Sequence, residues 1–544
     1  GPPFVSEFRL TTAPSAPALN SALAPFAHPV FRMLWTVWVA ANTCMWMNDV
    51  AAAWLMTTLT TSPMMVALVQ TASTLPVFLL GLPSGALADI LDRRRYLIMT
   101  QVWVAITALL LCLAILSDGI SAPLLLMLTF LNGIGLAMRM PVYSALMPEL
   151  VPRPQLPQAM ALNGIAMNVS RIIGPIIAGA LIASIGTAYV FVLNMVISAL
   201  ATLVLVRWRR EQKVSSLPGE RFLGAMRVGV QYVRQSTRMH AVLLRISVFF
   251  LQSSALLALL PLLARQMHGG NAGTFTVLLA SMGIGAIAAA LLMPRVRHRL
   301  TRDQIVLYGS MTEATAAVIV GFAPNAYVAS PAMMIAGLAW LAVANSVSVS
   351  AQLALPDWVR ARGMAIYQMT MMGSSAIGAA LWGQVATLSN LRTSLVLAAI
   401  AGVTVLWATR SFKVGGISED LTPQLPVQMP TLAEPLEDQR DGPVLVMIEY
   451  RIDPARSEEF REVMKETRRS RLQQGALSWE LFRDTVQPGR FIEYIVDESW
   501  VEHLRRFDRV TAGDVALRDR RRSFHIGEGL PIVTRCIAEP MDRN

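Results

Sequence analysis

The sequence has few charged residues and few cysteines, and each shortage excludes a class of protein. Only 15% of its 544 residues are Asp, Glu, Lys or Arg, whereas a soluble domain has about 25%. The three cysteines, Cys44, Cys112 and Cys536, lie far apart in the chain, so they form neither a disulfide framework nor a metal-binding spacing. We therefore expect no soluble globular enzyme, no metal centre and no cofactor.

Long apolar runs fill most of the chain. The mean hydropathy is +0.49, and about 20 consecutive apolar residues span the hydrocarbon core of a membrane as one helix. The predicted fold class is an all-α polytopic membrane protein, with twelve transmembrane helices in two pseudo-symmetric halves of six, followed by an α+β domain. The helices are expected at 31–59, 63–88, 96–117, 122–147, 158–184, 187–207, 240–264, 273–294, 303–322, 329–353, 360–388 and 391–410.

The basic residues indicate the orientation in the membrane. The formal net charge is +11, which in a soluble protein would suggest a nucleic-acid partner. Here arginine gathers in the links after even-numbered helices, while the links after odd-numbered helices hold only Arg265 and Arg392. Because positive loops stay inside, we expect a multi-pass membrane protein, surrounded by lipid, with both termini cytoplasmic and no nucleic-acid partner.

Composition divides the chain into six segments, and the two helical halves resemble each other. The spacing of small residues in the fifth helix recurs in the eleventh, where Gly174 corresponds to Gly378, as expected of duplicated transporter halves. The expected segments are an N-terminal tail (1–30), a six-helix bundle (31–207), a cytoplasmic linker (208–239), a second six-helix bundle (240–412), a Pro-rich linker (413–442) and a C-terminal domain (443–544).

The turn after the second helix carries a sequence signature. Gly85 is followed four residues later by Asp89, and then by Asp92, Arg93 and Arg94. This pattern resembles the signature of the major facilitator superfamily, in the branch that contains bacterial siderophore exporters such as the enterobactin exporter, although Asp92 replaces the usual glycine. The resemblance implies a protein of the bacterial inner membrane. It also implies a gate in which this turn contacts the eleventh helix, with Asp89 capping its positive N-terminal end. Alternatively, the charges only set topology.

The fifth helix carries a second signature. Ser170, Gly174, Pro175 and Gly179 resemble the antiporter pattern of the same family, with a serine in place of one glycine. In the family this pattern is associated with export. Small residues also let helices pack closely and proline kinks a helix, so packing alone is the alternative.

Ionisable residues inside the membrane are costly and are therefore site candidates. The candidates for proton coupling are Asp49, Arg139, Arg171 and Glu313. Asp49 would exchange an arginine partner for a proton, or else form a permanent ion pair that fixes helix packing. Arg139 matches the position of the family's helix-4 arginine, and Arg139 or Arg171 would alternatively bind an anionic substrate directly. Glu313 is expected on a peripheral helix in a structural role, and Arg245 at the membrane edge.

The substrate pocket is expected between the halves at mid-membrane. Its lining is predicted from polar, aromatic and methionine side chains on the central helices. The candidates are Trp46, Asn163, Phe249, Gln252, Asn345, Gln368 and Met372.

The segment from 443 onward alternates strands and helices in the order βαββαβ, which predicts a ferredoxin-like fold. It resembles the antibiotic-biosynthesis monooxygenase family, whose members usually dimerise through their sheets. No compact catalytic motif is present, so we expect a homodimer or a regulatory module rather than an enzyme. The residues to test for activity are Trp479, Trp500, His503, Arg505 and His525, of which His503 is expected on a solvated helix face.

The sequence favours a secondary active exporter of small amphipathic molecules (siderophores, drugs or metabolites), driven by proton antiport. No Gly-rich ATP-binding loop occurs in the chain. Three alternatives stay open: an uptake carrier of the same fold, a transporter fused to a domain that modifies its cargo, and a membrane receptor that moves nothing.

Overall fold

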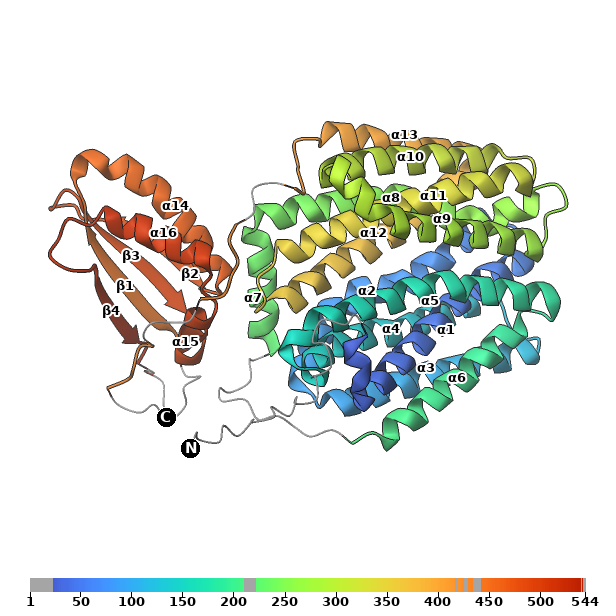
Figure 1. The fold of residues 1–544 in the computed structure, drawn as a ribbon, viewed down its shortest axis with the longest axis horizontal. Coiled ribbons are helices and arrows are strands. Elements are labelled where there is room, and N and C mark those ends of the chain that lie inside the picture. The colour runs from blue at the N-terminus through green and yellow to red at the C-terminus, as the bar shows by residue number, and fades with distance from the viewer. Residues whose placement is uncertain are drawn as a thin grey trace, which may run out of the picture.

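The computed structural model describes residues 23–209, 222–415, 419–424, 429–433, 442–539 and 541. Two bundles of long helices lie side by side, and a separate domain with a sheet lies beyond one end of both (Figure 1). A shorter helix, α7 (Phe222–Gln235), lies between that domain and the bundles. We call this end of the molecule the α7 end and the opposite one the far end.

Each bundle contains six long helices. The first bundle holds α1 (Pro29–Leu59), α2 (Pro63–Ile90), α3 (Arg93–Leu116), α4 (Ala122–Leu150), α5 (Leu156–Ser184) and α6 (Ala188–Arg207). The second holds α8 (Thr237–Gln266), α9 (Ala272–Arg299), α10 (Arg302–Phe322), α11 (Ala326–Leu353), α12 (Arg360–Leu388) and α13 (Leu391–Ala408). The fold class predicted from the sequence is confirmed.

Polar side chains fix where several of these helices begin. Asn271 accepts a hydrogen bond from the backbone of Thr274, and the Thr274 hydroxyl accepts one from the backbone of Asn271. Thr301 and Gln304 form the same reciprocal cap at the start of α10. Such caps satisfy backbone N–H groups that the first turn leaves unpaired.

In the described part of the chain, ten helices are long and apolar enough to cross a membrane. The two long helices outside that group are α1 and α12. Both pack extensively against neighbouring helices, with α12 lying along α2 of the other bundle. A helix that faces protein instead of lipid can carry polar residues such as Asn48 and Gln368, and these lower its mean hydropathy.

The apolar core shows where the two bundles meet and where they part. One cluster, the joint core, unites both bundles at the far end, and separate cores fill the α7 end of each bundle. The joint core includes buried residues from 47–56, 255–267 and 379–386. The first bundle's own core includes residues from 34–38 and 142–146, and the second bundle's own core includes residues from 239–250 and 343–355. The bundles are therefore closed on each other at the far end and separately packed at the α7 end.

Polar and aromatic contacts reinforce the closed far end. Arg265 of α8 donates to the Thr57 hydroxyl of α1 at 2.7 Å, and its guanidinium lies 4.5 Å from the ring centre of Trp54. The Trp54 ring stacks on Phe275 of α9 at 5.4 Å. These side chains come from both bundles, so separating the far end would break all three contacts.

The helix α7 was not expected, because the sequence predicts a cytoplasmic linker at 208–239. It is amphipathic, with Ala225, Val228 and Tyr232 buried on one side. The helix also contacts the C-terminal domain, where Gln231 donates to the Leu472 carbonyl at 2.7 Å and Arg227 pairs with Glu498 at 3.3 Å. The helix therefore joins the second bundle to the C-terminal domain.

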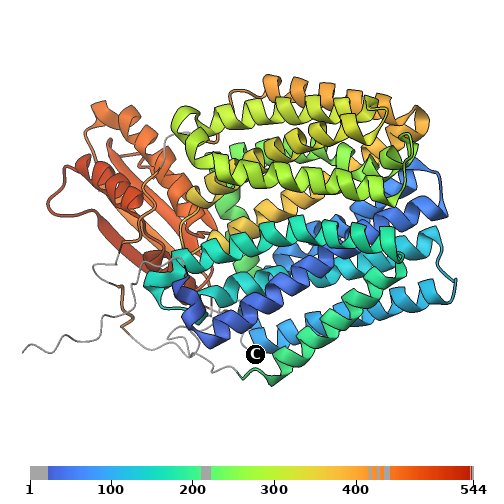
Figure 2. The same ribbon diagram turned by 45° about the vertical axis from the view of Figure 1, so that its right-hand side comes forward.

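The C-terminal domain is a four-stranded antiparallel sheet with helices on one face (Figures 1 and 2). Its strand order, β2-β3-β1-β4, agrees with the predicted βαββαβ arrangement. The core gathers around Phe460, whose ring lies 5.3 Å from that of Phe491 and 5.8 Å from that of Phe524. The elements are β1 (Val444–Arg451), α14 (Ser457–Gln473), β2 (Ser478–Arg483), β3 (Arg490–Asp497), α15 (Trp500–Asp508), α16 (Ala512–Ser523) and β4 (Ile532–Ile537).

Candidate transport site between the two bundles

Arg171 lies at the level where the joint core ends. On α5, Ala166 belongs to the first bundle's own core and Ala178 to the joint core, with Arg171 between them. On α1, Trp38 likewise belongs to the first bundle's own core and Met47 to the joint core. This level is the base of the region in which the bundles are packed separately. In transporters built from two halves, the cargo binds between the halves near this level.

The guanidinium of Arg171 connects the bundles through two indole rings. Its carbon lies 4.5 Å from the ring centre of Trp340 on α11 and 5.5 Å from that of Trp46 on α1. Trp340 is in turn edge-on to Phe250 of α8 at 5.7 Å. A cation over an indole face is stabilised by the ring's negative charge density. We call Arg171, Trp46 and Trp340 the inter-bundle cluster.

Asp49 lies three residues after Trp46, on the same side of α1. Its side chain is partly exposed. Among the residues that the structure describes, no hydrogen bond or ion pair reaches its carboxylate. The permanent ion pair that the sequence left open, with Arg139 or Arg171 as partner, is therefore not formed in this conformation.

Arg139 belongs to the interior of the first bundle. It is buried on α4, and its Nε has no partner in the described part of the chain. It interacts electrostatically with Tyr143, one turn further along the same helix. The structure thus places Arg139 apart from the inter-bundle cluster.

Glu313 and Gln252, predicted in two different roles, contact each other. The Gln252 side-chain amide donates to the Glu313 carboxylate at 2.6 Å, and both side chains are buried between α8 and α10. Phe249, another pocket candidate, is buried in the second bundle's own core. These three residues face the interior of the second bundle.

Three more pocket candidates are partly exposed on α11 and α12: Asn345, Gln368 and Met372. The Oε1 atom of Gln368 is buried and accepts no hydrogen bond from the residues described. Gln368 and Met372, both on α12, fall between Tyr367, in the second bundle's own core, and Ala379, in the joint core. They therefore lie near the level of Arg171.

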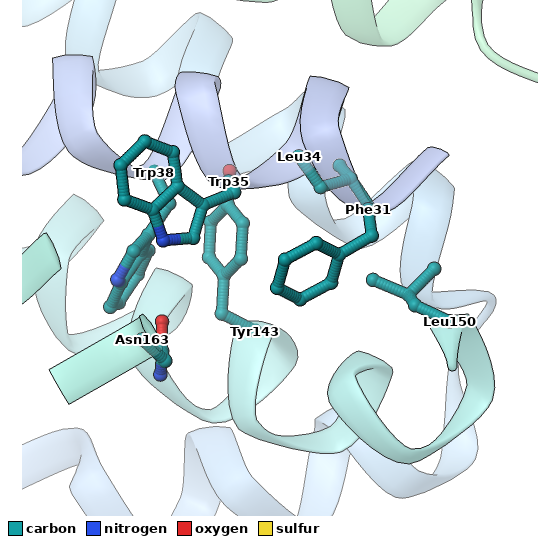
Figure 3. A pocket seen from close by; sticks show the side chains of 7 residues that line it. All are labelled: Phe31, Leu34, Trp35, Trp38, Tyr143, Leu150 and Asn163. Atoms are coloured by element: carbon teal, nitrogen blue, oxygen red, sulfur yellow. The ribbon is translucent and has the colours of Figure 1, made fainter. Parts of the chain in front are cut away.

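Asn163 lines a pocket inside the first bundle, toward the α7 end. Figure 3 shows its amide across from Trp35, Trp38 and Tyr143. The Trp35 indole donates to the Leu162 carbonyl at 3.0 Å, whereas the Trp38 indole and the Tyr143 hydroxyl are buried without a partner among the described residues. The remaining lining is apolar: Phe31, Leu34 and Leu150.

The signature of the fifth helix lies at helix contacts. The Ser170 hydroxyl is 3.3 Å from the Val39 carbonyl of α1, and a Cβ at Gly174 would approach Trp46 to 2.7 Å. Gly179 packs against Thr276 of α9 in the other bundle. Pro175 lies inside the helix. The small residues therefore allow α5 to approach both α1 and the second bundle.

The signature after the second helix lies at the α7 end. Arg93 pairs with Glu149 at the end of α4, and Arg94 donates to the Val206 carbonyl at the end of α6 at 2.6 Å. Asp92 is the residue before α3. The side chain of Asp89 lies outside the described residues, so its predicted cap on the eleventh helix stays a prediction.

The two glycines at the end of α2 have different surroundings. A Cβ at Gly81 would collide with Met369 of α12, whereas a Cβ at Gly85, one turn later, would meet nothing within 4 Å. Helix α2 therefore packs tightly on α12 at Gly81, whereas there is space for a side chain at Gly85.

His503 is buried in the C-terminal domain, so its predicted place on a solvated face is wrong. Its Nδ1 lies 2.7 Å from Asp497, and its Nε2 accepts a hydrogen bond from Arg535 at 3.0 Å. Burial lowers the pKa of His503. Burial raises the pKa of Asp497, but Arg506 and His503 hold it below its usual range.

The other residues named for this domain are dispersed. Trp479 donates to the buried Glu493 carboxylate at 2.8 Å, which also accepts from Tyr450 and Arg471. Arg505 pairs with Glu502 within α15. In the described part of the chain, no group of His, Cys, Asp and Glu side chains is arranged to hold a metal ion.

Trp340 and Tyr143 were missed from the sequence. Trp340 lies in an apolar run that a lipid-facing helix also shows, and only the fold brings it to Arg171. Tyr143 follows Arg139 by one turn, and that spacing could have linked the two side chains.

In the part of the chain that the structure describes, twelve long helices form two bundles that join at one end, which is the arrangement of a transporter of the major facilitator type. A family model described as transmembrane secretion effector (MFS_3) matches residues 20–543, so the chain belongs to that family. It is a multi-pass membrane transporter.

Several relatives carry names of transport proteins. The chain is 24% identical to the staphyloferrin A transporter of Staphylococcus aureus over 46% of its own length and 63% of that protein. It is 25% identical to macrolide efflux protein A of Enterococcus faecalis, over 40% and 68%. It is 23% identical to the enterobactin exporter EntS of Citrobacter koseri, over 69% and 89%. The matched part thus spans less than two thirds of the staphyloferrin transporter.

Solved structures share the fold at low sequence identity. The nucleoside transporter NupG superposes with a TM-score of 0.57 at 12% identity, covering 71% of this chain and 99% of that one. A bacterial homologue of the lysosomal transporter Spinster, in an inward-facing and occupied conformation, gives a TM-score of 0.52 at 16% identity, covering 70% and 95%. These similarities concern the fold alone.

Proposed function

We propose that the chain exports small amphipathic molecules in exchange for protons, by alternating access of a site between its two bundles. The observation that carries this proposal is the Asp49 carboxylate. It lies on α1 beside the inter-bundle cluster and has no ion-pair partner among the described residues, so a proton can bind it without breaking a salt bridge. A carboxylate in the membrane that is not held by a partner is expected to have a function.

The direction of transport is proposed from two observations. The relatives include an enterobactin exporter and macrolide efflux proteins, and the fifth helix carries the antiporter-like signature around Gly174. Nothing in the described structure favours uptake over export on its own.

The proposed orientation places the α7 end in the cytoplasm. The arginine-rich links after α2, α4, α6, α9 and α11 lie at this end, together with α7 and the C-terminal domain, as positive-inside topology requires. With that orientation, the joint core at the far end and the separate cores at the α7 end describe an inward-facing state. Cargo would then reach the site from the cytoplasm.

The C-terminal domain is proposed to pair with a second copy. Its helices cover one face of the sheet (Figure 1). The strand register places Phe482, Tyr494 and Ile532 on the other face, together with the ion pair between Glu449 and Arg490. Phe482 is 53% exposed and Ile532 is 62% exposed. An exposed apolar sheet face of this kind is typical of an interaction surface.

The test of transport is flux in proteoliposomes under an imposed pH gradient, with a panel of fluorescent dyes. Asp49→Asn removes the titratable group with little change in shape. Asp118→Asn, in the exposed turn after α3, is the matched control. We expect gradient-driven flux in wild type and in the control, and its loss in Asp49→Asn. Equal flux in all three proteins would remove Asp49 from the mechanism.

A further inference from the structure

Arg171 is a charged side chain between the bundles without an anionic partner. In the part of the chain that the structure describes, its guanidinium donates no hydrogen bond and forms no ion pair, and its Nε is buried. Arg245, by contrast, donates to the backbone carbonyls of Phe412 and Thr409 at 3.0 and 2.6 Å. Withdrawing a guanidinium from water without a counter-charge costs free energy, and two indole faces offset only part of that cost.

We infer that Arg171 binds the anionic group of the transported molecule. The inference rests on the proposed transport function and names the class of its cargo: small organic anions, such as carboxylates, that also carry an aromatic or apolar part. A guanidinium offers a planar set of donors that matches a carboxylate. Trp46 and Trp340 supply adjacent aromatic surface for the rest of the molecule.

The position of Arg171 suits a residue that cargo must contact. It belongs to the first bundle, Trp340 belongs to the second, and both lie at the base of the region where the bundles are packed separately. Arg139 is less suited, because it is buried inside the first bundle. Asp49 forms no ion pair with Arg171 in this conformation, so the guanidinium stays available to an external anion.

The experiment measures equilibrium binding to the purified full-length protein by fluorescence anisotropy. Two dyes with related ring systems serve as probes, the anionic carboxyfluorescein and the cationic rhodamine 6G. The variants are Arg171→Gln, which removes the charge, and Arg171→Lys, which keeps the charge without the planar donors. The matched control is Arg392→Gln, since Arg392 also lies over an aromatic ring, that of Phe322 at 5.3 Å, but is exposed in the first turn of α13.

Arg171→Gln is expected to weaken binding of the anionic dye at least ~10-fold, because a hydrogen-bonded charge pair is lost. Binding of the cationic dye should stay unchanged or become tighter. Arg171→Lys should recover part of the anion binding, and Arg392→Gln should bind both dyes as wild type does. If Arg171→Gln does not fold, a selective loss of anion affinity in Arg171→Lys carries the same meaning.

Three results would overturn the inference: a wild type that binds the cation but not the anion, equal affinities in wild type and Arg171→Gln, or equal weakening of both dyes. The last would make Arg171 a brace between tryptophans. This readout is separate from transport. Anion binding that depends on Arg171, without any gradient-driven flux, would contradict proton antiport but not the anion site. Gradient-driven flux of the cation, without selective anion binding, would contradict the anion site but not proton antiport.

Discussion

The side-chain amide of Gln252 donates a hydrogen bond to the carboxylate of Glu313 at 2.6 Å, between α8 and α10 of the second bundle. Both residues are buried, and Glu313 has no positively charged partner among the residues described. The pair stands apart from Arg171 and Asp49, although the sequence made Glu313 a candidate for proton coupling. The geometry favours a structural hydrogen bond.

Replacing Glu313 should therefore affect stability and not coupling. Glu313→Gln keeps a hydrogen-bonding partner for Gln252, so we expect flux and melting temperature close to wild type. Glu313→Leu leaves the buried amide unpaired and should lower the free energy of unfolding by about 1–3 kcal/mol. Thermal melting in detergent and flux in proteoliposomes check both. Loss of gradient-driven flux in a folded Glu313→Gln protein would place Glu313 in the proton path.

Gly85 and Gly81 should respond differently to added side chains. A Cβ added at Gly81 would collide with Met369 in this conformation, whereas one added at Gly85 would meet nothing within 4 Å. Gly81→Val should lower the melting temperature, because the added atoms collide with a packed neighbour. Gly85→Val should leave it nearly unchanged but reduce flux, if the α7 ends of α2 and α12 close on each other during the cycle. Normal flux in Gly85→Val would show that this turn does not become tightly packed.

The helices were predictable because a membrane leaves the chain few options. A spanning segment must pair its own backbone groups, so each span appears as a long apolar run bounded by polar caps. The helix α7 lacks that signal, because it is short, amphipathic and flanked by basic residues. Its buried side, with Val228 and Tyr232, becomes recognisable only once a partner surface is known.

The site was predictable residue by residue but not as an arrangement. Asp49, Arg139 and Arg171 are conspicuous as charges in apolar runs, yet only the fold separates Arg139 from Arg171. Trp340 lies far from Arg171 in the chain, so no local pattern joins them. The burial of His503 on α15 was misjudged for the same reason, since its partner Arg535 comes from β4, far along the chain.

The buried His503 predicts an acid-sensitive contact in the C-terminal domain. Its pKa is lowered in the folded protein, so folding favours the neutral ring. This contribution to stability is present above the unfolded pKa of about 6.5 and is lost as the pH falls below it. We expect hydrogen exchange in α15 and β4, corrected for intrinsic rates, to be less protected at pH 5.5 than at pH 7.5.

His503→Gln should reduce this difference between the two pH values, because the titrating ring is gone. His525→Gln is the matched control. Burial and Arg451 lower the pKa of His525 as well, but it is less enclosed and lies outside the Asp497 contact. The same pH effect in wild type and His503→Gln would assign the acid sensitivity to other groups.

The open sheet face of the C-terminal domain predicts a dimer that one charge can dissociate. Phe482 is 53% exposed on β2, and its ring lies edge-on to Tyr494 of β3 at 5.8 Å. Burying such a side chain contributes about 1.5–3 kcal/mol, so Phe482→Glu should weaken self-association at least ~10-fold. Light scattering coupled to size-exclusion chromatography of the full-length protein measures the change. Val486→Glu, in the turn after β2 and 83% exposed, should stay dimeric, and a monomeric wild type would contradict pairing through this face.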